Sequence, residues 1–205
     1  MKVLDLFCGL GGFSQAFKDR NHDVVTIDIE DKFNPTICTD IMKITPKELI
    51  EGYGEFDVIL ASPPCNCFSC MSISRYWKNG LPLEETKKSI ELVKHTLNLI
   101  YDIHPKFWFM ENPMGMLRTV IGNPPVLVYY AQYGEDRLKP TDIWGRHPKG
   151  FKDMQITDKS LLDYTKCPRG SKIGGTQGMK NAEVRAKIPY QLSECICKLV
   201  EKNIN

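Results

Sequence analysis

The stretch Asp5-Leu-Phe-Cys-Gly9-Leu-Gly11-Gly12-Phe13-Ser14 decides the fold of this chain, because it joins an apolar run to a glycine turn and then to a helical pattern. Glycines let the backbone turn tightly and approach a ligand, and a helix start offers free N–H groups to an anion. Asp28 lies 19 positions after Gly9, at the end of the next predicted strand. A nucleotide-binding α/β fold places its ribose-binding carboxylate there. A dinucleotide site would need glycine at position 14, where this chain has serine.

The rest of the first half alternates between strand and helix patterns. Residues 84–103 carry apolar side chains at helical spacing and are predicted to form a helix that packs on a core. Runs rich in apolar and β-branched residues predict four strands, at residues 2–7, 23–29, 56–61 and 106–110. Strands that alternate with helices indicate a mostly parallel α/β sheet.

The second half has a different pattern. Residues 126–130 and 141–144 are predicted to form the two strands of an antiparallel hairpin. Residues 146–180 are rich in Gly, Lys and Pro and show little periodicity, whereas residues 181–200 return to a helical pattern that Pro189 interrupts. We therefore expect one domain, built from residues 1–145 and 181–205, with residues 146–180 as a short basic insert.

Charge is spread unevenly along the chain, although the formal net charge is only +2. Residues 1–136 carry 13 Lys and Arg against 18 Asp and Glu, whereas residues 137–187 carry 12 against 5. A basic segment on an acidic body indicates a surface that faces a polyanion, unless it is simply a solvated face.

Membrane and secretory signals are not apparent in the sequence. No apolar run approaches the roughly 20 residues that span a bilayer, and Asp5 falls where the apolar core of a signal peptide would begin. We therefore expect a cytoplasmic protein whose eight cysteines are free thiols, mostly packed as small apolar side chains. The crowding of Cys65, Cys67 and Cys70 makes a zinc site an alternative, but paired Cys-x-x-Cys knuckles are missing and we predict no metal.

A second motif, Ala61-Ser-Pro-Pro-Cys65-Asn-Cys-Phe68-Ser69, directly follows a predicted buried strand. Ligands of open α/β sheets bind at that edge. Two prolines stiffen the loop before Cys65 and could hold its thiol in a fixed position for attack. Cysteine suits a reaction that needs a good nucleophile which also leaves well. A structural cysteine in a proline-rich turn is the alternative.

A third motif, Met110-Glu111-Asn112-Pro113, is predicted to lie just past another strand. A buried carboxylate at a sheet edge can act as an acid or hydrogen-bond donor, although Asn-Pro is also a common helix start. The order of the motifs decides between these interpretations. Each motif follows a successive strand, so we expect the glycine turn, Asp28, Cys65 and Glu111 to converge on one edge of one sheet.

With these motifs the chain resembles the DNA cytosine-C5 methyltransferases over most of its length, which implies a Rossmann-like sheet that binds S-adenosylmethionine. The glycine motif is similar to the one that binds the methionine part of this cofactor in the family. By this resemblance Asp28 would hold the ribose hydroxyls, Ile29 would pack on adenine, and Asp40 would meet the adenine amino group. The cofactor site implied by the resemblance comprises Asp5, Phe7, Gly9, Gly11, Gly12, Asp28, Ile29, Asp40, Ile41 and Pro63.

The same resemblance implies a site for a cytosine base in DNA. The Pro-Cys-x-x-Phe-Ser pattern is similar to the family's catalytic loop, so Cys65 would attack C6 of the base. Glu111 would bond N3 and the exocyclic amine. The target carbon is unreachable inside a stacked duplex, so the base must be flipped out. The remaining catalytic and substrate-binding positions implied are Lys139, Pro64, Ser69, Asn112, Arg137 and Thr141.

The chain departs from the family pattern in three places. The basic strand Arg137-Leu-Lys139-Pro-Thr141 replaces the usual Gln-x-Arg-x-Arg, and the Gly-Asn expected before Arg185-Ala-Lys-Ile-Pro189 is missing. Residues 146–180 stand where relatives carry a substantial target-recognition domain. This short stretch resembles the compact forms of the family found in phage and other mobile elements. Recognition of DNA would then be short or loose, or supplied by a homodimer partner or a separate specificity subunit.

Other functions stay open from the sequence. A tRNA cytosine-C5 methyltransferase would use the same chemistry, and a nucleic-acid-binding relative could have lost catalysis. Ser62-Pro-Pro-Cys65 also partly resembles the Asp-Pro-Pro-Tyr loop of exocyclic-amine methyltransferases, but cysteine cannot stack on a base as the aromatic side chain does there. The sequence reveals neither the target site nor whether a restriction enzyme accompanies the protein in its prokaryotic or phage-infected cell.

Overall fold

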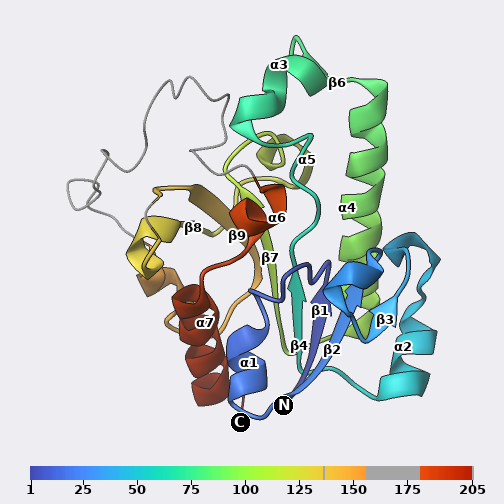
Figure 1. The fold of residues 1–205 in the computed structure, drawn as a ribbon, viewed down its shortest axis with the longest axis vertical. Coiled ribbons are helices and arrows are strands. Elements are labelled where there is room, and N and C mark those ends of the chain that lie inside the picture. The colour runs from blue at the N-terminus through green and yellow to red at the C-terminus, as the bar shows by residue number, and fades with distance from the viewer. Residues whose placement is uncertain (136, 156–180, 205) are drawn as a thin grey trace.

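The computed structural model describes residues 1–135, 137–155 and 181–204. These residues form one seven-stranded sheet with helices on both faces, and a separate two-stranded hairpin (Figure 1). In spatial order the strands of the large sheet are β3 (Ile37–Cys38), β2 (Asp23–Asp28), β1 (Lys2–Leu6), β4 (Val58–Ala61), β7 (Phe107–Pro113), β9 (Pro140–Arg146) and β8 (Val126–Tyr129).

The sheet is mostly parallel. The five strands from β3 to β7 pair in parallel, whereas β9 pairs antiparallel with both β7 and β8. The prediction of a mostly parallel α/β sheet with an antiparallel hairpin is therefore confirmed. The hairpin joins the sheet through its second strand, because β9 lies between β7 and β8.

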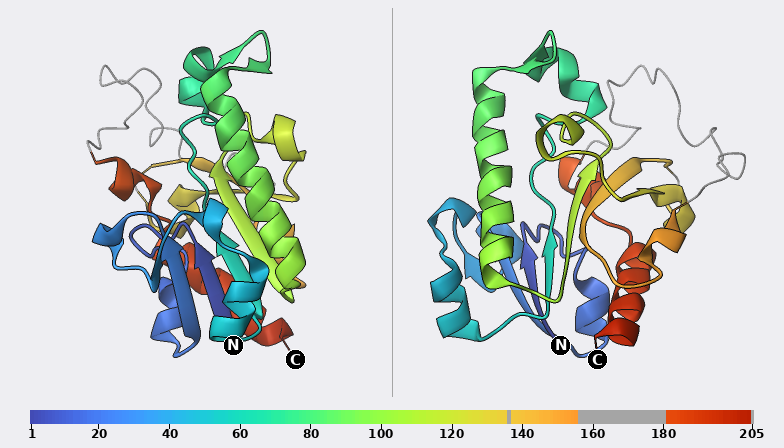
Figure 2. Two further views of the ribbon diagram at one scale, coloured as in Figure 1. Left: turned by 90° about the vertical axis from the view of Figure 1, so that its right-hand side faces the viewer. Right: turned by 180° about the vertical axis from the view of Figure 1, so that it is seen from behind.

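Two hydrophobic clusters lie on opposite faces of the sheet. Leu4 and Leu6 of β1 belong to one cluster and Val3 to the other, because successive side chains of a strand point to opposite faces. Helices α2 (Pro46–Tyr53) and α4 (Glu84–Ile103) cover the first cluster. Helices α1 (Gln15–Asp19) and α7 (Tyr190–Asn203) cover the second, on the other side of the sheet (Figure 1 and Figure 2).

Local sequence signals mark several of the helices. The predicted helix at residues 84–103 is confirmed as α4. Helix α2 starts with a capping box, in which Thr45 and Glu48 each accept a hydrogen bond from the other's backbone N–H, and Pro46 occupies the first helical position. Pro189 separates α6 (Ala182–Ala186) from α7, as predicted.

Several short elements connect these parts and were not predicted. They are too short for a hydrophobic period to reveal them. They are the hairpin strands β5 (Trp77–Lys78) and β6 (Leu81–Pro82), the helices α3 (Ile73–Tyr76) and α5 (Arg118–Ile121), and the 3-10 helices η1 (Asp31–Phe33), η2 (Ile41–Lys43), η3 (Cys70–Ser72), η4 (Tyr130–Tyr133) and η5 (Phe151–Met154).

The third motif lies inside a strand, and here the prediction was wrong. Met110 is the last residue of β7 that pairs with β4, but pairing with β9 continues through Glu111 and Asn112. The antiparallel neighbour therefore extends β7 past the end of its parallel neighbour. Both expectations for this motif, a loop just past the strand and a helix start, are corrected by this pairing.

The described start of the predicted insert packs with the sheet. Phe151 is fully buried in the second cluster and meets the ring of Phe109 edge to face. Residues 156–180 lie outside the described residues, so the insert and its boundaries stay a prediction. In the part of the chain that the structure describes, no helix is long and apolar enough to cross a bilayer.

Candidate active site

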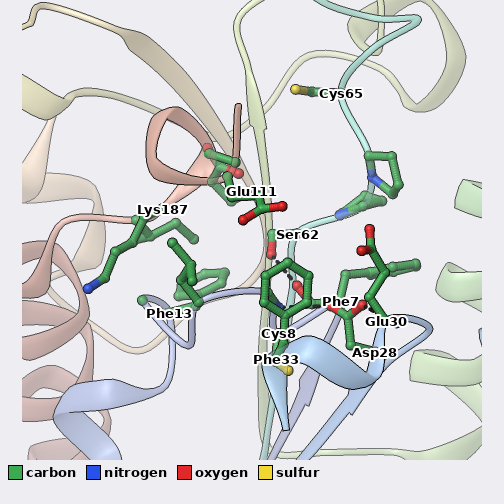
Figure 3. A pocket seen from close by; sticks show the side chains of 18 of the residues that line it. Phe7, Cys8, Phe13, Asp28, Glu30, Phe33, Ser62, Cys65, Glu111 and Lys187 are labelled. Carbon is green, nitrogen blue, oxygen red and sulfur yellow. Dashed lines mark hydrogen bonds between the residues drawn. The ribbon is translucent and has the colours of Figure 1, made fainter. Parts of the chain in front are cut away.

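A cavity of about 440 Å³ opens at the carboxyl ends of the central strands (Figure 3). The residues that follow β1, β2 and β4 form its walls together with the end of β7 and the segment around α6. The expected convergence of the three motifs on one sheet edge is therefore observed. The predicted site residues that line the cavity are Phe7, Gly9, Gly12, Asp28, Ile29, Asp40, Ile41, Pro63, Pro64, Cys65, Glu111 and Lys139.

The remaining predicted site residues are not part of this lining. Several of them support the residues that are. They are Asp5, Gly11, Ser69, Asn112, Arg137 and Thr141. Other residues that line the cavity were not predicted to do so. Phe13, Ser62 and Lys187 lie inside motifs identified in the sequence but were given no role there, whereas Glu30, Phe33 and Glu183 belong to no motif.

The glycine turn is held in shape by backbone contacts. Gly9 and Gly11 have φ angles of 47° and 72°, in the left-handed region that glycine adopts without strain. At Gly12 a Cβ atom would lie 2.6 Å from the carbonyl oxygen of Ile188, so only glycine lets the two segments meet. The carboxylate of Asp28 accepts hydrogen bonds from the N–H groups of Gly9, at 2.9 Å, and Glu30, at 3.0 Å. Asp28 therefore joins the end of β2 to the turn.

Asp5 lies beneath the turn and is fully buried. The hydroxyl of Ser14 donates a hydrogen bond of 2.5 Å to its Oδ2, whereas Oδ1 has no hydrogen-bond partner among the described residues. Burial raises the pKa of Asp5 to about 7, and the hydrogen bond from Ser14 opposes this shift. This hydrogen bond gives Ser14 a role that the glycine of a dinucleotide-binding motif could not fill at position 14.

The lower part of the cavity combines apolar walls with carboxylates. Phe7, Phe13 and Phe33 contribute rings, and Ile29 is 65% exposed beside them. The carboxylates come from Asp28, Glu30 and Asp40 (Figure 3 shows the first two). This set fits S-adenosylmethionine, because aromatic and aliphatic walls suit adenine, and carboxylates suit hydroxyl groups, amines and positive charge.

Two ion pairs made by Lys32 join two residues of the cavity lining. Lys32 of η1 pairs with Glu30 on one side and, at 2.6 Å, with Glu183 of α6 on the other. Both carboxylates belong to residues that line the cavity. The segment that carries α6 is thus tied to the residues that follow β2.

The second motif forms the upper wall. The side-chain amide of Asn112 donates a hydrogen bond of 2.9 Å to the carbonyl oxygen of Pro63, which fixes the loop to β7. Ser69 forms an antiparallel bridge with Gly115 at the other end of the loop, and its hydroxyl accepts from Met71 N–H. Between these anchors Cys65 is half-buried and faces the same cavity as Glu111 (Figure 3).

One carboxyl oxygen of Glu111 faces two hydrogen donors. Glu111 is 4% exposed, and its Oε1 accepts a hydrogen bond of 2.9 Å from the hydroxyl of Tyr130. The ammonium of Lys139 lies 3.8 Å from the same oxygen. Burial raises the pKa of Glu111, and Lys139 and Tyr130 oppose the shift. Burial also raises the pKa of Cys65, helped by the charge of Glu111 and opposed by Lys139.

The basic segment at residues 137–141, of which only Pro140 and Thr141 lie in β9, reaches the cavity through the side chain of Lys139. Lys139 has a φ of 27° and directs its ammonium to the carbonyl oxygen of Arg185, at 3.3 Å, as well as to Glu111. Arg137 is buried and pairs with Glu135 at 3.1 Å. Thr141 is buried too, and its hydroxyl donates to the carbonyl oxygen of Lys139. The last two therefore brace the strand.

The described cysteines are free thiols. The hydroxyl of Ser89 donates to Cys67, and Cys70 donates to the carbonyl oxygen of Met114. Among the described residues, the group with metal-ligand spacing is instead His22, Cys197 and Glu201. Arg20 already pairs with that glutamate at 2.6 Å, in addition to the histidine.

Comparisons with known proteins agree with this site. The family model described as C-5 cytosine-specific DNA methylase matches residues 1–123. A protein of frog virus 3 named "Probable DNA (cytosine-5)-methyltransferase" is 30% identical over 156 residues, which cover 70% of each chain. The type II methyltransferase M.XorII of Xanthomonas oryzae is 29% identical over 128 residues, 55% of this chain but only 28% of that protein.

A solved structure has the same fold. The methyltransferase EhMeth of Entamoeba histolytica matches with a TM-score of 0.50 at 18% identity, over 71% of this chain and 52% of that one. The chain thus spans about half the length of this structure and under a third of the bacterial relative. The chain belongs to the family of C-5 cytosine-specific DNA methylases, enzymes that take their methyl group from S-adenosylmethionine.

Proposed function

We propose that this chain methylates C5 of cytosine in DNA, with Cys65 as a covalent nucleophile and the target base flipped out of the duplex. One observation carries the proposal: Cys65, Glu111 and Lys139 line the same cavity as the glycine turn. When bound, S-adenosylmethionine supplies an electrophilic methyl group. The residues that would hold it are Phe7, Gly9, Gly12, Asp28, Ile29, Asp40, Ile41 and Pro63.

In the first step the thiolate of Cys65 attacks C6 of the base, because C5 of a neutral cytosine is a poor nucleophile. A bond forms between Sγ and C6, the electron pair of the C5–C6 double bond moves into the C4–C5 bond, and the electron pair of the C4–N3 double bond moves onto N3. Glu111 donates its proton to N3 and bonds the exocyclic amine, so C5 becomes the nucleophilic carbon of an enamine. C5 then accepts the methyl group. A base removes the proton from C5, Cys65 leaves as a thiolate by elimination, and N3 returns its proton to Glu111.

The charges around the cavity support these roles. Proton donation requires a neutral Glu111, and burial raises the pKa of this carboxyl. A neutral Glu111 also removes the negative charge that opposes ionisation of Cys65, whereas the ammonium of Lys139 favours the thiolate. Donation of the proton by one side chain and attack by the other are thus mutually compatible.

We further propose that residues 146–180 act as a short basic target-recognition insert on a catalytic domain formed by residues 1–145 and 181–205. The excess of Lys and Arg over residues 137–187 supports contact with phosphates. Because bacterial relatives carry the name type II methyltransferase, we place the chain among restriction-modification enzymes that act on DNA in the cytoplasm. A second copy or a specificity subunit would enlarge so short a recognition surface.

The test is to express the chain in cells that lack cytosine-C5 methylation and to sequence the methylated cytosines in their DNA. We expect methylated cytosines within one short sequence, and none with Cys65→Ser. In parallel, the purified protein is incubated with duplex DNA or tRNA and radiolabelled S-adenosylmethionine. Incorporation into tRNA alone would replace DNA by tRNA as the substrate. Cofactor binding with incorporation into neither would identify a relative that has lost catalysis.

A further inference from the structure

Tyr130 is a buried aromatic residue that no motif pointed to. It lies in η4, directly after β8, and its side chain is fully buried in the second hydrophobic cluster. A buried tyrosine hydroxyl normally finds a hydrogen-bond partner. Here the partner is Oε1 of Glu111, at 2.9 Å. The hydroxyl therefore donates to the carboxyl group that, in the proposed reaction, protonates N3 of cytosine.

Lys139 directs its charge to the same place. Its ammonium lies 3.8 Å from Oε1 of Glu111 and 4.1 Å from the centre of the Tyr130 ring. Both donors thus act on one oxygen of the carboxyl. A proton on Oε1 would have to point at donors, because hydroxyl and ammonium both present hydrogens. The arrangement therefore favours a proton on Oε2.

We propose that Tyr130 is a positioning residue, which holds Oε1 of Glu111 as an acceptor so that Oε2 carries the proton destined for cytosine N3. This inference rests on the proposed function. In the transfer the O–H bond at Oε2 breaks and an N–H bond forms at N3. The electron pair stays on the carboxylate, which the hydroxyl of Tyr130 and the ammonium of Lys139 then stabilise.

The pKa of Glu111 reports this contact. The titratable and charged groups that face Glu111 or its two donors come from four segments. They are Cys65 of the loop after β4, Tyr130 of η4, Glu135, Arg137 and Lys139 between η4 and β9, and Asp142 of β9. A hydroxyl that donates to a carboxylate favours its ionised form, so loss of the hydroxyl should raise the pKa of Glu111 further.

The test compares Tyr130→Phe with a matched control, Tyr133→Phe, which removes a hydroxyl from the same 3-10 helix and the same cluster. Two quantities are measured: the pH dependence of kcat for DNA methylation, and the carboxyl titration of Glu111 in the free protein. The titration uses ¹³C-labelled glutamate, with Glu111→Gln to assign the signal. We expect Y130F to lower kcat at least about tenfold with an unchanged KM for the cofactor. Its alkaline limb and the titration of Glu111 should both move to higher pH, and Y133F should move neither.

The titration separates this inference from the proposed function. An unchanged Glu111 titration in Y130F would overturn the positioning role even if kcat falls. A shifted titration in a protein that never methylates DNA would support the contact while sinking the proposed function. Should Y130F not fold, incorporation of 3-fluorotyrosine gives a test of opposite sign. Its more acidic hydroxyl donates more strongly and should move the titration of Glu111 to lower pH, and an unmoved titration would again overturn the role.

Discussion

Two buried acids, Asp5 and Glu111, carry the unusual charge states of this protein. Burial disfavours the ionised form of both and raises both pKa values. Their surroundings differ, because Asp5 meets one hydroxyl beneath the glycine turn, whereas Glu111 meets Tyr130 and Lys139 at the cavity. We therefore propose that Glu111, inside β7, carries the chemistry and that Asp5, near the end of β1, has a supporting role.

Asp5→Asn should make the protein more stable above pH 7. The pKa of Asp5 is about 7 in the folded chain against a usual 3.8, so folding disfavours the ionised form by up to about 4 kcal/mol. This cost is absent below pH 3.8 and is complete only above pH 7. Asparagine stays neutral and keeps an acceptor for Ser14. Urea unfolding should show that Asp5→Asn increases the free energy of unfolding at pH 8, and that the increase is smaller at pH 5. An equal change at both pH values would contradict the raised pKa of Asp5.

At the scale of elements, the loop that carries Cys65 depends on a close backbone approach. A Cβ atom at Gly115 would lie 2.1 Å from the carbonyl oxygen of Phe68, and Ser69 forms its bridge to the same glycine. The N–H of Met116 also donates to Phe68, at 2.7 Å. The loop that carries Cys65 is therefore fixed at its far end by the segment that follows β7.

Gly115→Ala should displace the loop that carries Cys65, because backbone atoms cannot give way as the end of a flexible side chain can. We expect at least about a tenfold loss of kcat, since small misplacements of a reacting group are costly, with an unchanged Kd for the cofactor. Gly52→Ala in α2 is the matched control, because an added Cβ meets no atom within 4 Å there. Wild-type kcat in G115A would show that this contact does not position the loop.

The long elements could be predicted from sequence because their patterns repeat. Helix α4 extends over enough residues for a helical period, and the central strands are apolar runs between turn signals. Glu111 was placed outside its strand because the pairing that extends β7 comes from β9, about thirty residues further along the chain. The pairing register of two strands that are distant in the chain cannot be predicted from the sequence of either strand alone.

The sequence motifs predicted several of the residues that line the cavity, but not the hydrogen bonds that these residues form. The spacing from Gly9 located Asp28 at the cavity, yet its carboxylate also serves the backbone of the turn, which spacing cannot reveal. Tyr130 was missed because its contact with Glu111 depends on how the hairpin packs against β7. Pattern predicts where a side chain lies, whereas its partners follow from tertiary packing.

At the scale of the molecule, the uneven charge should govern binding to DNA. Each phosphate contact by Lys or Arg releases a counterion, so the slope of log K against log salt concentration is negative and its magnitude falls by about 0.9 for each contact removed. Lys149 and Lys152 are exposed and lie within the basic part of the chain.

The double variant Lys149→Gln and Lys152→Gln should weaken binding to duplex DNA and make the slope shallower, as measured by fluorescence anisotropy between 50 and 200 mM salt. Lys47→Gln is the control, because this lysine lies on α2 in the acidic half of the chain. An unchanged slope in the double variant, or an equal change in the control, would locate the DNA elsewhere on the surface.

The proposed covalent role of Cys65 is tested most directly with duplex DNA that carries 5-fluorocytosine at the target position, incubated with the protein and S-adenosylmethionine. Fluorine at C5 cannot be removed as a proton, so elimination is blocked and the bond to the sulfur persists. We predict a stable protein–DNA adduct that peptide mapping by mass spectrometry assigns to Cys65, and no adduct with C65S. Methylation of unmodified DNA without any adduct, or an adduct on Cys67 or Cys70, would contradict the account.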